Sequence, residues 1–280
     1  MHKIKKYLIH NNKLSYDEIL RSCSFSNHDI QLIVFDKIDS TNNWILTNSP
    51  QLISSNNRIL IAVVAEYQSS GRGRQGRTWF CETGNCLTFS VLRHFKKKPS
   101  LLSGLSLVIG LAIIRTLKAF SIINIQLKWP NDILYEKKKL AGILTEIRVK
   151  PDGTTFAAIG IGVNFYLSDP LKQLINQEAT DLFEITGYHL DRNQVLGKLL
   201  TELKNMLDDF ETYGFLYFRN EWIKSHAYEG CEVTLKLPTG ATIDGAVDGI
   251  DDSGALKLIT NSGIRTFNIG DISLRLKAES

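Results

Sequence analysis

Residues 71–79 read GRGRQGRTW, and the spacing of their glycines invites a comparison with a known turn. The glycines spell G-x-G-x-x-G, the pattern of a turn that binds a dinucleotide. That pattern requires the glycines to open a helix and an acidic residue about twenty positions later. Here residues 78–93 continue as loop and strand, and the later region is the lysine triplet at 96–98. The sequence therefore argues against a doubly wound, dinucleotide-binding fold.

The arginines between these glycines indicate a different kind of site. An arginine/glycine tail that binds nucleic acid would lie in a repetitive segment, but this stretch directly follows the apolar run RILIAVVAEYQ (58–68). Glycines let backbone N–H groups approach a ligand closely, and guanidinium groups bind phosphate or carboxylate through paired hydrogen bonds. We therefore expect a loop that wraps an anion. Trp79 either stacks on a heterocycle such as adenine or anchors the loop to the core.

The composition is that of a globular protein with no strong overall charge. The 280 residues are 43% hydrophobic and 22% charged, and the formal charge of +4 means that anion binding must come from local clusters. Four cysteines without a C-x-x-C pair do not predict a disulfide scaffold, nor metal or redox chemistry. The basic N-terminus lacks the features of a signal peptide, and no uninterrupted apolar run has membrane-spanning length. These features predict a cytoplasmic protein without a membrane partner.

Hydrophobic periodicity predicts a mixed α/β body followed by a small all-β domain. The segment from Cys231 onward consists of short apolar runs divided by the turns PTG, DDSG and NSG, which is typical of a small antiparallel barrel. The expected strands of the body are residues 58–68, 86–93, 125–130, 139–149 and 155–165, the last two joined by the turn Pro151-Asp152-Gly153. The expected helices are residues 103–120, a long segment capped by Asp191, and a short segment around 217–224.

Polar residues stand where several of these runs end. Residues 39–42 read DSTN and follow the apolar run LIVFDKI, although taken alone they are better explained as a helix N-cap. Gln68 ends the strand before the arginine loop, Lys128 ends a strand at Trp129-Pro130, and Asn164 ends a glycine-containing strand. We expect these groups to converge on one site.

Together these segments resemble the biotin–protein ligases, specifically the bacterial enzymes that make biotinyl-adenylate. The resemblance runs from about residue 32 to the C-terminus, and the combination of GRGRxGRxW with KWPND is very specific. The motifs that carry it are DSTN (39–42), EYQSSGRGRQGRTW (66–79), LSLVIG (105–110), KWPNDI (128–133), KLAGILTE (139–146) and IGIGVN (159–164).

The resemblance implies an α+β fold in three segments. Residues 1–30 are a short N-terminal segment, and residues 31–227 are a catalytic domain like those of class II aminoacyl-tRNA synthetases and biotin–lipoate ligases, with a mixed sheet and flanking helices. Residues 228–280 are a small Src-homology-3-like β-barrel. Many bacterial relatives carry a DNA-binding winged helix before the catalytic domain, but the short first segment leaves no room for a helix-turn-helix. We therefore expect no DNA binding, which disfavours a biotin-responsive transcriptional regulator.

The resemblance also implies which residues bind biotin. Biotin has an uncharged ureido ring and a carboxylate, so its pocket must satisfy each of the ring's hydrogen-bonding groups away from water. Hydroxyl and amide side chains suit this ring, and the ring-binding candidates are Ser40, Thr41, Asn42 and Gln68. Further candidates for the biotin site are Arg72, Gly73, Arg74 and Lys128.

ATP and biotin carry the two anions that must meet, so neutralisation and alignment are the main demands on the site. Lys128 matches the family lysine that bridges the biotin carboxylate and the α-phosphate, and Lys128 and Arg72 are the expected catalytic residues. Asp132 is the candidate for placing Mg²⁺, with a role in capping or tying its loop as the alternative. The candidates for binding ATP and the adenylate are Arg74, Arg77, Trp79, Lys139 and Asn164.

The implied reaction has two steps. Biotin and ATP form biotinyl-5'-AMP and pyrophosphate, and biotin then passes to a lysine of the biotin carboxyl carrier protein of acetyl-CoA carboxylase. The enzyme is expected to be a monomer or a homodimer. The alternative enzyme is a lipoate– or octanoate–protein ligase or transferase, which is similar in fold; the arginine-glycine loop and the small C-terminal barrel argue against it.

Overall fold

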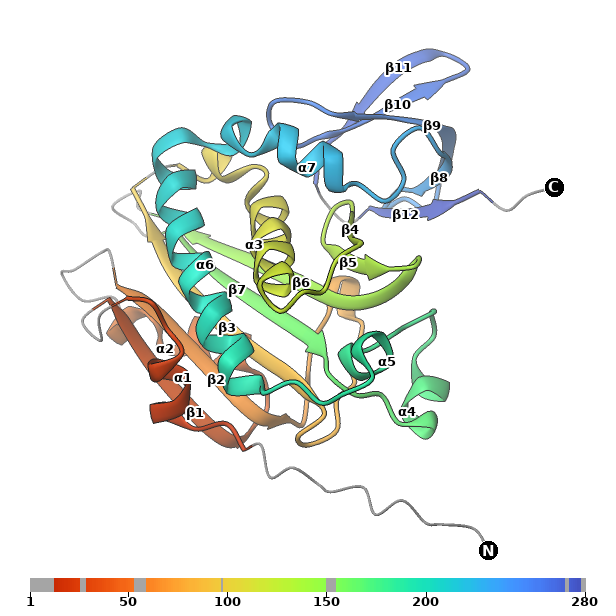
Figure 1. Ribbon diagram of the computed structural model, residues 1–280. Coiled ribbons are helices and arrows are strands. Elements are labelled where there is room, and N and C mark those ends of the chain that lie inside the picture. Colours follow the sequence, from red (N-terminus) through yellow and green to blue (C-terminus); the bar gives the residue numbers. More distant parts are fainter. Residues whose placement is uncertain are drawn as a thin grey trace, which may run out of the picture.

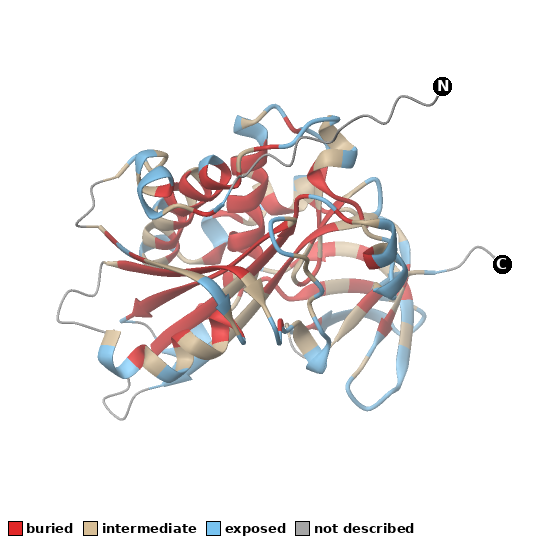
Figure 2. Ribbon diagram, turned by 90° about the horizontal axis from the view of Figure 1, so that it is seen from below, coloured by how far each residue is buried: buried red, intermediate tan, exposed pale blue. Residues whose placement is uncertain are grey.

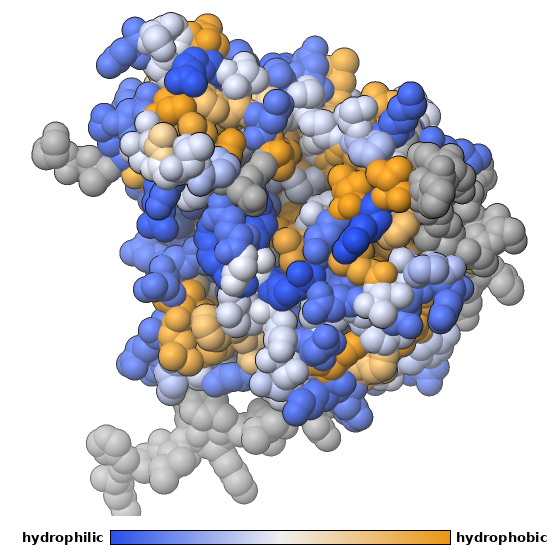
Figure 3. Space-filling model, turned by 180° about the vertical axis from the view of Figure 1, so that it is seen from behind, coloured by the Kyte–Doolittle hydropathy of each residue, from blue (hydrophilic) through white to orange (hydrophobic). Residues whose placement is uncertain are grey.

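The protein consists of a seven-stranded mixed sheet with helices on both faces and a five-stranded antiparallel sheet beside it (Figure 1). The computed structural model describes residues 13–25, 29–52, 59–96, 98–149, 155–269 and 272–277. Buried residues concentrate in the central strands and in the helices next to them (Figure 2). The face seen in Figure 3 is largely hydrophilic and carries separate small apolar patches.

The large sheet has the strand order β1-β2-β3-β7-β6-β5-β4. β1 and β2 are parallel, and the other neighbouring strands are antiparallel. All ten residues of β3 are buried, so this strand lies at the centre of the core. The strands are β1 (Ile30–Ile38), β2 (Leu60–Gln68), β3 (Cys86–Phe95), β4 (Ile125–Lys128), β5 (Asp132–Tyr135), β6 (Lys138–Val149) and β7 (Thr155–Asn164).

The predicted strands are confirmed, with two differences. The segment expected to run from 125 to 130 ends at Lys128, and the chain turns at Trp129-Pro130 into the short strand β5, which periodicity did not predict. β6 and β7 pair antiparallel as expected, while the turn proposed for Pro151-Asp152-Gly153 lies outside the described residues.

Helices cover both faces of the sheet. α3 (Leu105–Ala119) and α6 (Arg192–Tyr213) pack together over one face and supply much of the main core. α2 (Thr41–Leu52) packs on the opposite face, where Ile45 joins residues of β2, β3 and β7 in a smaller apolar cluster. The remaining helices are α1 (Tyr16–Arg21), α4 (Asp169–Leu174), α5 (Leu182–Thr186) and α7 (Arg219–Ser225), with short 3₁₀ turns at Arg74–Gly76, Pro99–Leu102 and Phe215–Tyr217.

Local sequence explains where α6 begins. Asp191 has extended backbone angles, and its carboxylate accepts hydrogen bonds from the backbone N–H groups of Asn193 at 2.8 Å and Gln194 at 3.4 Å. These bonds satisfy N–H groups that the first turn of a helix leaves without a partner. The predicted N-cap is confirmed.

One apolar segment needs separate mention because of its length. Among the described residues, Pro99–Ala119 is long and apolar enough to cross a membrane, but 72% of its most apolar window is buried inside the protein. Its side chains fill the space between the sheet and α6. This segment is therefore explained as the core helix of a globular protein, and the cytoplasmic location remains a prediction.

The C-terminal segment forms the expected small all-β domain. Its strands follow the order β11-β10-β9-β8-β12, and all its pairs are antiparallel. The turn at Ser253-Gly254 attaches this domain to the body: Trp129 Nε1 donates to the Gly254 carbonyl at 3.0 Å, and Ser103 Oγ donates to the Ser253 carbonyl at 2.7 Å. The strands are β8 (Glu232–Lys236), β9 (Thr242–Ile250), β10 (Leu256–Thr260), β11 (Gly263–Phe267) and β12 (Ser273–Leu276).

Two of the cysteines are joined. Cys81 and Cys86 form a disulfide with a Cα–Cα distance of 6.0 Å, which links the end of the arginine loop to the start of β3. The bond closes a loop of only a few residues, and the sequence analysis did not predict it. Cys23 and Cys231 are free thiols, and burial raises the pKa of the Cys23 thiol to about 11.

His226 lies where α7 ends and the chain enters the C-terminal domain. Its ring packs against Trp222 with centroids 4.6 Å apart, and its Nδ1 lies 3.3 Å from the Glu229 carboxylate. Nε2 is buried and has no partner among the described residues, so protonation would place an unpaired N–H in the core. Burial accordingly lowers the pKa of His226 from 6.5 to about 4. The neutral ring therefore donates from Nδ1 to Glu229.

We expect this histidine to make the protein sensitive to acid. In the unfolded chain the imidazole takes up a proton below pH 6.5, whereas in the folded protein it does so only near pH 4. The free energy of unfolding should therefore fall by on the order of 2–3 kcal/mol as pH drops through this window. His226→Gln keeps an N–H donor for Glu229 but does not titrate, so its stability should vary less. Urea unfolding across the window measures both.

His189 is exposed, so His189→Gln provides a matched control for the exchange of histidine for glutamine. If His226→Gln loses stability with acid as steeply as the parent protein, the buried imidazole is not the cause.

Candidate active site

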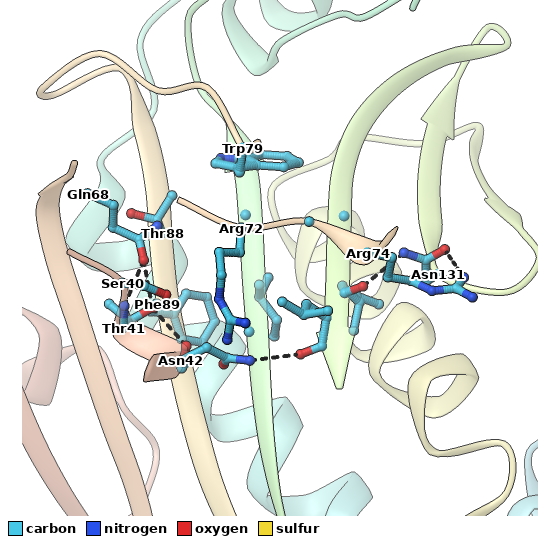
Figure 4. Close-up of a pocket in the computed structure, with 18 of the residues that line it drawn as sticks. Ser40, Thr41, Asn42, Gln68, Arg72, Arg74, Trp79, Thr88, Phe89 and Asn131 are labelled. Carbon is cyan, nitrogen blue, oxygen red and sulfur yellow. Dashed lines mark hydrogen bonds between the residues drawn. The ribbon is translucent and has the colours of Figure 1, made fainter. Parts of the chain in front are cut away.

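A cavity lies over the central strands of the large sheet, where the end of β2, the start of α2 and the arginine loop meet (Figure 4). It brings together the ring-binding candidates predicted from the sequence with the loop residues at 72–74. In Figure 4, Ser40, Thr41, Asn42 and Gln68 lie on one side of Trp79, and Arg74 with Asn131 lies on the other. The floor of the cavity is formed by short stretches of β6 and β7. We call this the first cavity.

A hydrogen-bond network fixes Thr41 and Gln68. Gln68 Oε1 accepts from the Thr41 backbone N–H at 2.8 Å and from Thr41 Oγ1 at 3.1 Å. Thr41 Oγ1 also lies 2.7 Å from Ser90 Oγ on β3. Because the amide oxygen of Gln68 accepts these bonds, its N–H groups are the ones left for a ligand. The N-cap interpretation of this segment also holds, since Ser40 Oγ accepts from the Asn43 N–H at 3.4 Å.

Asn42 presents an acceptor to the first cavity. Its Nδ2 donates to Glu146 Oε2 at 2.8 Å and to the Leu144 carbonyl at 3.4 Å. Its Oδ1 is buried, has no partner among the described residues and faces Gly160, where a Cβ would lie only 2.9 Å away. A buried acceptor without a partner costs about 1–3 kcal/mol. An N–H group of a ligand would remove this penalty.

Two facing glycines make the floor of the cavity flat. Gly142 of β6 pairs in register with Gly162 of β7, and Trp79 lies across both. A Cβ at Gly162 would stand 2.6 Å from Trp79 Cζ2, and one at Gly142 would stand 3.1 Å from Trp79 Cζ3. Gly142 and Gly162 therefore make room for the indole. Trp79 anchors the loop to the sheet, and its ring lines the first cavity as well as a second, neighbouring one.

The second cavity is rich in cations. It is lined by Lys128, Lys139, Arg77 and Asp132 from the body and by Tyr228 and Arg275 from the C-terminal domain. Burial is the main cause that lowers the pKa of Lys128, and the charges of Lys139, Arg275 and Arg77 lower it further, while Asp132 acts in the opposite sense. Like charges held this close favour a bound anion.

The two lysines predicted for the site occupy different places. Lys128 lines the second cavity only, with its Nζ 5.8 Å from the centre of the Tyr228 ring. Lys139 lines both cavities, and its Nζ lies 2.7 Å from Asp132 Oδ1 and 5.7 Å from the centre of the Trp79 ring. Lys139 therefore stands at the junction of the two cavities, a position that the sequence did not assign to it.

The three arginines of the loop point in three directions. Arg72 forms an ion pair with Glu146 at 2.7 Å, on the side of the first cavity. Arg74 donates to Asn131 Oδ1 at 2.9 Å and lines both cavities. Arg77 lines the second cavity and donates to Gln75 Oε1 at 2.7 Å. The loop is held by hydrogen bonds from Gly73 N–H to the Arg77 carbonyl and from Trp79 N–H to the Gly71 carbonyl.

Asn164 is the one predicted nucleotide contact that lines neither cavity. Its side chain is buried, and its Nδ2 donates to the Thr180 carbonyl at 3.0 Å and to the Lys139 carbonyl at 3.4 Å. Asn164 therefore ties the start of β6 to the segment around residue 180. These bonds hold the backbone of Lys139, and a direct contact between Asn164 and the nucleotide stays a prediction.

Several residues of the site were not singled out from the sequence. Asn131 and Glu146 lie in the motifs KWPNDI and KLAGILTE, which also contain Lys128 and Lys139. Their position in these motifs is the sequence feature that could have identified them. Tyr228 and Arg275 carry no such signal, because only the docking of the C-terminal domain brings them to the second cavity.

Comparison with known proteins agrees with this geometry. Residues 34–165 match the Biotin/lipoate A/B protein ligase family, and residues 230–275 match the Biotin protein ligase C terminal domain. The chain is 36% identical over 242 residues to the bifunctional ligase/repressor BirA of Escherichia coli, a match covering 86% of this chain and 73% of that protein. It is 34% identical to the biotin–[acetyl-CoA-carboxylase] ligase of Paracoccus denitrificans, covering 79% of this chain and 91% of that protein.

A solved structure extends the agreement to three dimensions. The biotin protein ligase from Aquifex aeolicus in complex with biotin and ATP superposes with a TM-score of 0.73 at 32% identity, covering 88% of this chain and 99% of that one. The resemblance found in the sequence motifs is thus confirmed by sequence and by fold. The chain belongs to the biotin protein ligases of the biotin/lipoate A/B protein ligase family.

Proposed function

We propose that this protein joins biotin to ATP, forming biotinyl-5'-AMP and pyrophosphate, and then transfers biotin to a lysine of a biotin carboxyl carrier protein. The observation that carries the proposal is the pair of joined cavities, the first lined by hydroxyl and amide groups and the second by cations. The Aquifex relative was solved with biotin and ATP, the two substrates that such a pair of cavities would hold.

The first cavity suits the ureido ring of biotin. This ring has one carbonyl acceptor and two N–H donors, so it needs donors and an acceptor from the protein. The N–H groups of Gln68 and the hydroxyl of Ser40 are available donors, and Asn42 Oδ1 is an available acceptor. Groups that are fixed by their neighbours before the ligand arrives need no reorganisation on binding.

The junction between the cavities is the proposed place of reaction. A carboxylate oxygen of biotin attacks the α-phosphorus of ATP, and the bond from that phosphorus to the pyrophosphate oxygen breaks. The cations that line both cavities are Lys139 and Arg74. Sequence resemblance gives the bridging role to Lys128. We propose that Lys139 fills it, because Lys139 lines both cavities and Lys128 lines the second, where it would meet the phosphates.

The proposed reaction also uses Mg²⁺, for which the second cavity offers candidate ligands. No group of three or more histidine, cysteine, aspartate or glutamate side chains gathers within the described ranges. Mg²⁺ is commonly held by one or two carboxylates together with substrate phosphates, and Asp132 and Glu178 both line the second cavity. The pair fits such an ion, which would neutralise phosphate charge. Asp132 also pairs with Lys139, so it would have a second role in orienting that lysine.

The second step moves the biotinyl group to the acceptor. The lysine amine attacks the acyl carbon of the adenylate, and AMP leaves with the electrons of the acyl–oxygen bond. The described lining of the two cavities contains no histidine, so the proton of the amine would pass to the adenylate phosphate or to solvent. The Paracoccus relative is named for acetyl-CoA carboxylase, and the carrier protein of that enzyme is the proposed acceptor.

The first prediction tests this function against its alternatives. With biotin and ATP the protein should release pyrophosphate, and a biotin carrier domain should raise the turnover. Lipoate or octanoate in place of biotin should give far less, because neither has a ureido ring for the polar groups of the first cavity. Pyrophosphate release with each acid, with and without carrier, measures the preference. A preference for lipoate would contradict the proposal.

The second prediction concerns the lysines. Lys139→Ala should lower the rate of adenylate formation by on the order of 10²–10³-fold, because its charge is needed where the two anions approach. Lys128→Ala should act mainly through the nucleotide, raising KM for ATP more than KM for biotin. Single-turnover pyrophosphate release at varied substrate concentrations separates the effects. If only Lys128→Ala abolished the chemical step, the bridging role would return to Lys128.

The third prediction uses the glycines of the floor. In Gly162→Ala the new methyl group collides with Trp79, so ATP binding should weaken more than biotin binding. In Gly160→Ala it collides with Asn42 Oδ1, so biotin binding should weaken more. Overpacking of this kind costs about 1–3 kcal/mol of stability and displaces the residue that it meets, so the affinity for the affected ligand should fall by about 10-fold or more. Calorimetric titration of each ligand into each variant tests the crossed pattern, and equal losses in both would refute it.

A further inference from the structure

Glu146 lies behind the first cavity and contacts two of its residues at once. Its Oε2 accepts from Arg72 at 2.7 Å and from Asn42 Nδ2 at 2.8 Å. Arg72 belongs to the arginine loop and Asn42 to the first turn of α2, so one carboxylate oxygen joins two elements that are far apart in the chain. Glu146 itself is on β6 and is not among the residues that line the cavity.

This carboxylate fixes which way the Asn42 amide faces. The two groups on the far side of the amide, Glu146 Oε2 and the Leu144 carbonyl, are both acceptors. An amide turned the other way would set its own oxygen against them, with no hydrogen bond formed. Nδ2 must therefore face Glu146, and Oδ1 is left facing Gly160, whose lack of a side chain makes room for it. The cavity thereby receives an acceptor and not a donor.

Stability gives little reason for the arrangement. The side chains of Arg72 and Glu146 are 39% and 27% exposed, and ion pairs at such positions contribute about 0–1 kcal/mol. The ion pair instead fixes the positions of two side chains. The same carboxylate that orients Asn42 holds Arg72 beside the mouth of the first cavity, as Figure 4 shows for Arg72 pointing toward Asn42.

We infer that Glu146 is a positioning residue that sets the specificity of the first cavity for a ligand N–H group and couples this choice to the arginine loop. The inference deepens the proposed function, on which it rests for the identity of the ring. Losing the carboxylate would free the Asn42 amide to turn and present N–H groups to the ureido N–H. It would also release Arg72 from its place over the cavity.

The test compares Glu146→Ala with Glu146→Gln. The alanine variant loses both hydrogen bonds and frees the Asn42 amide to turn, which would leave a buried N–H group of biotin without its acceptor. Its Kd for biotin should therefore rise by roughly 5- to 150-fold. The glutamine variant keeps a neutral acceptor for Asn42 and should lose less. In both variants KM for biotin should change more than kcat, because Glu146 touches no reacting atom.

A double-mutant cycle shows whether Glu146 acts through Asn42. If it does, Glu146→Ala should add little to the loss already caused by Asn42→Ala. Additive losses would overturn the inference, and so would an unchanged Kd for biotin in a folded Glu146→Ala. Should the alanine variant fail to fold, the cycle with Glu146→Gln decides the question by the same criterion.

Glu184 supplies the matched control. It also joins two partners, Lys138 and Lys172, each at 2.9 Å, but it lines neither cavity. Glu184→Ala removes a comparable double ion pair and should leave biotin affinity unchanged. The wild-type protein must first release pyrophosphate with biotin and ATP. Failure there contradicts the proposed function, whereas success there with an unaffected Glu146→Ala contradicts only the role of Glu146.

Discussion

The geometry of the site depends on the absence of side chains where Gly142 and Gly162 face each other across β6 and β7. A Cβ at Gly162 would collide with the Trp79 ring, and one at Gly142 would press against it. Because the indole packs directly against the backbone of these glycines, the arginine loop lies over the sheet. Its arginines therefore line both cavities. The usual cost of glycine in a strand is weaker packing and greater loss of chain entropy. Here that cost is offset by the fixed position of the loop.

A second constraint is the charge gathered around Lys128. Its burial and three nearby cations all act to lower its pKa, and Asp132 compensates only in part. Such a cluster destabilises the empty site, because each charge is partly desolvated and repels the others. A bound polyphosphate reverses this balance. The repulsion between these cations therefore lowers the stability of the empty protein, and it also makes the second cavity selective for an anion.

The sequence predicted the elements better than the directions of their side chains. Strands such as β2 and β7 follow from apolar runs, and α3 from helical periodicity, because burial imposes those patterns. The strand β5 was missed, since its four residues are too few to show a period. Asn164 was assigned to the nucleotide, yet it bonds backbone at Thr180, a partner that only tertiary folding supplies. Glu146 resembles any solvated acid on a strand until Asn42 is placed beside it.

Both domains contribute residues to the second cavity, so their docking affects its charge. Trp129 follows Lys128 directly in the chain, and its indole donates to the Gly254 carbonyl in a turn of the C-terminal domain. Arg275 of the same domain lines the second cavity and lowers the pKa of Lys128. A displacement of this domain would therefore remove a cation from the cavity and relax the environment of a lysine at the same moment. An anion that binds to the full cluster of charges must therefore also favour the docked arrangement of the two domains.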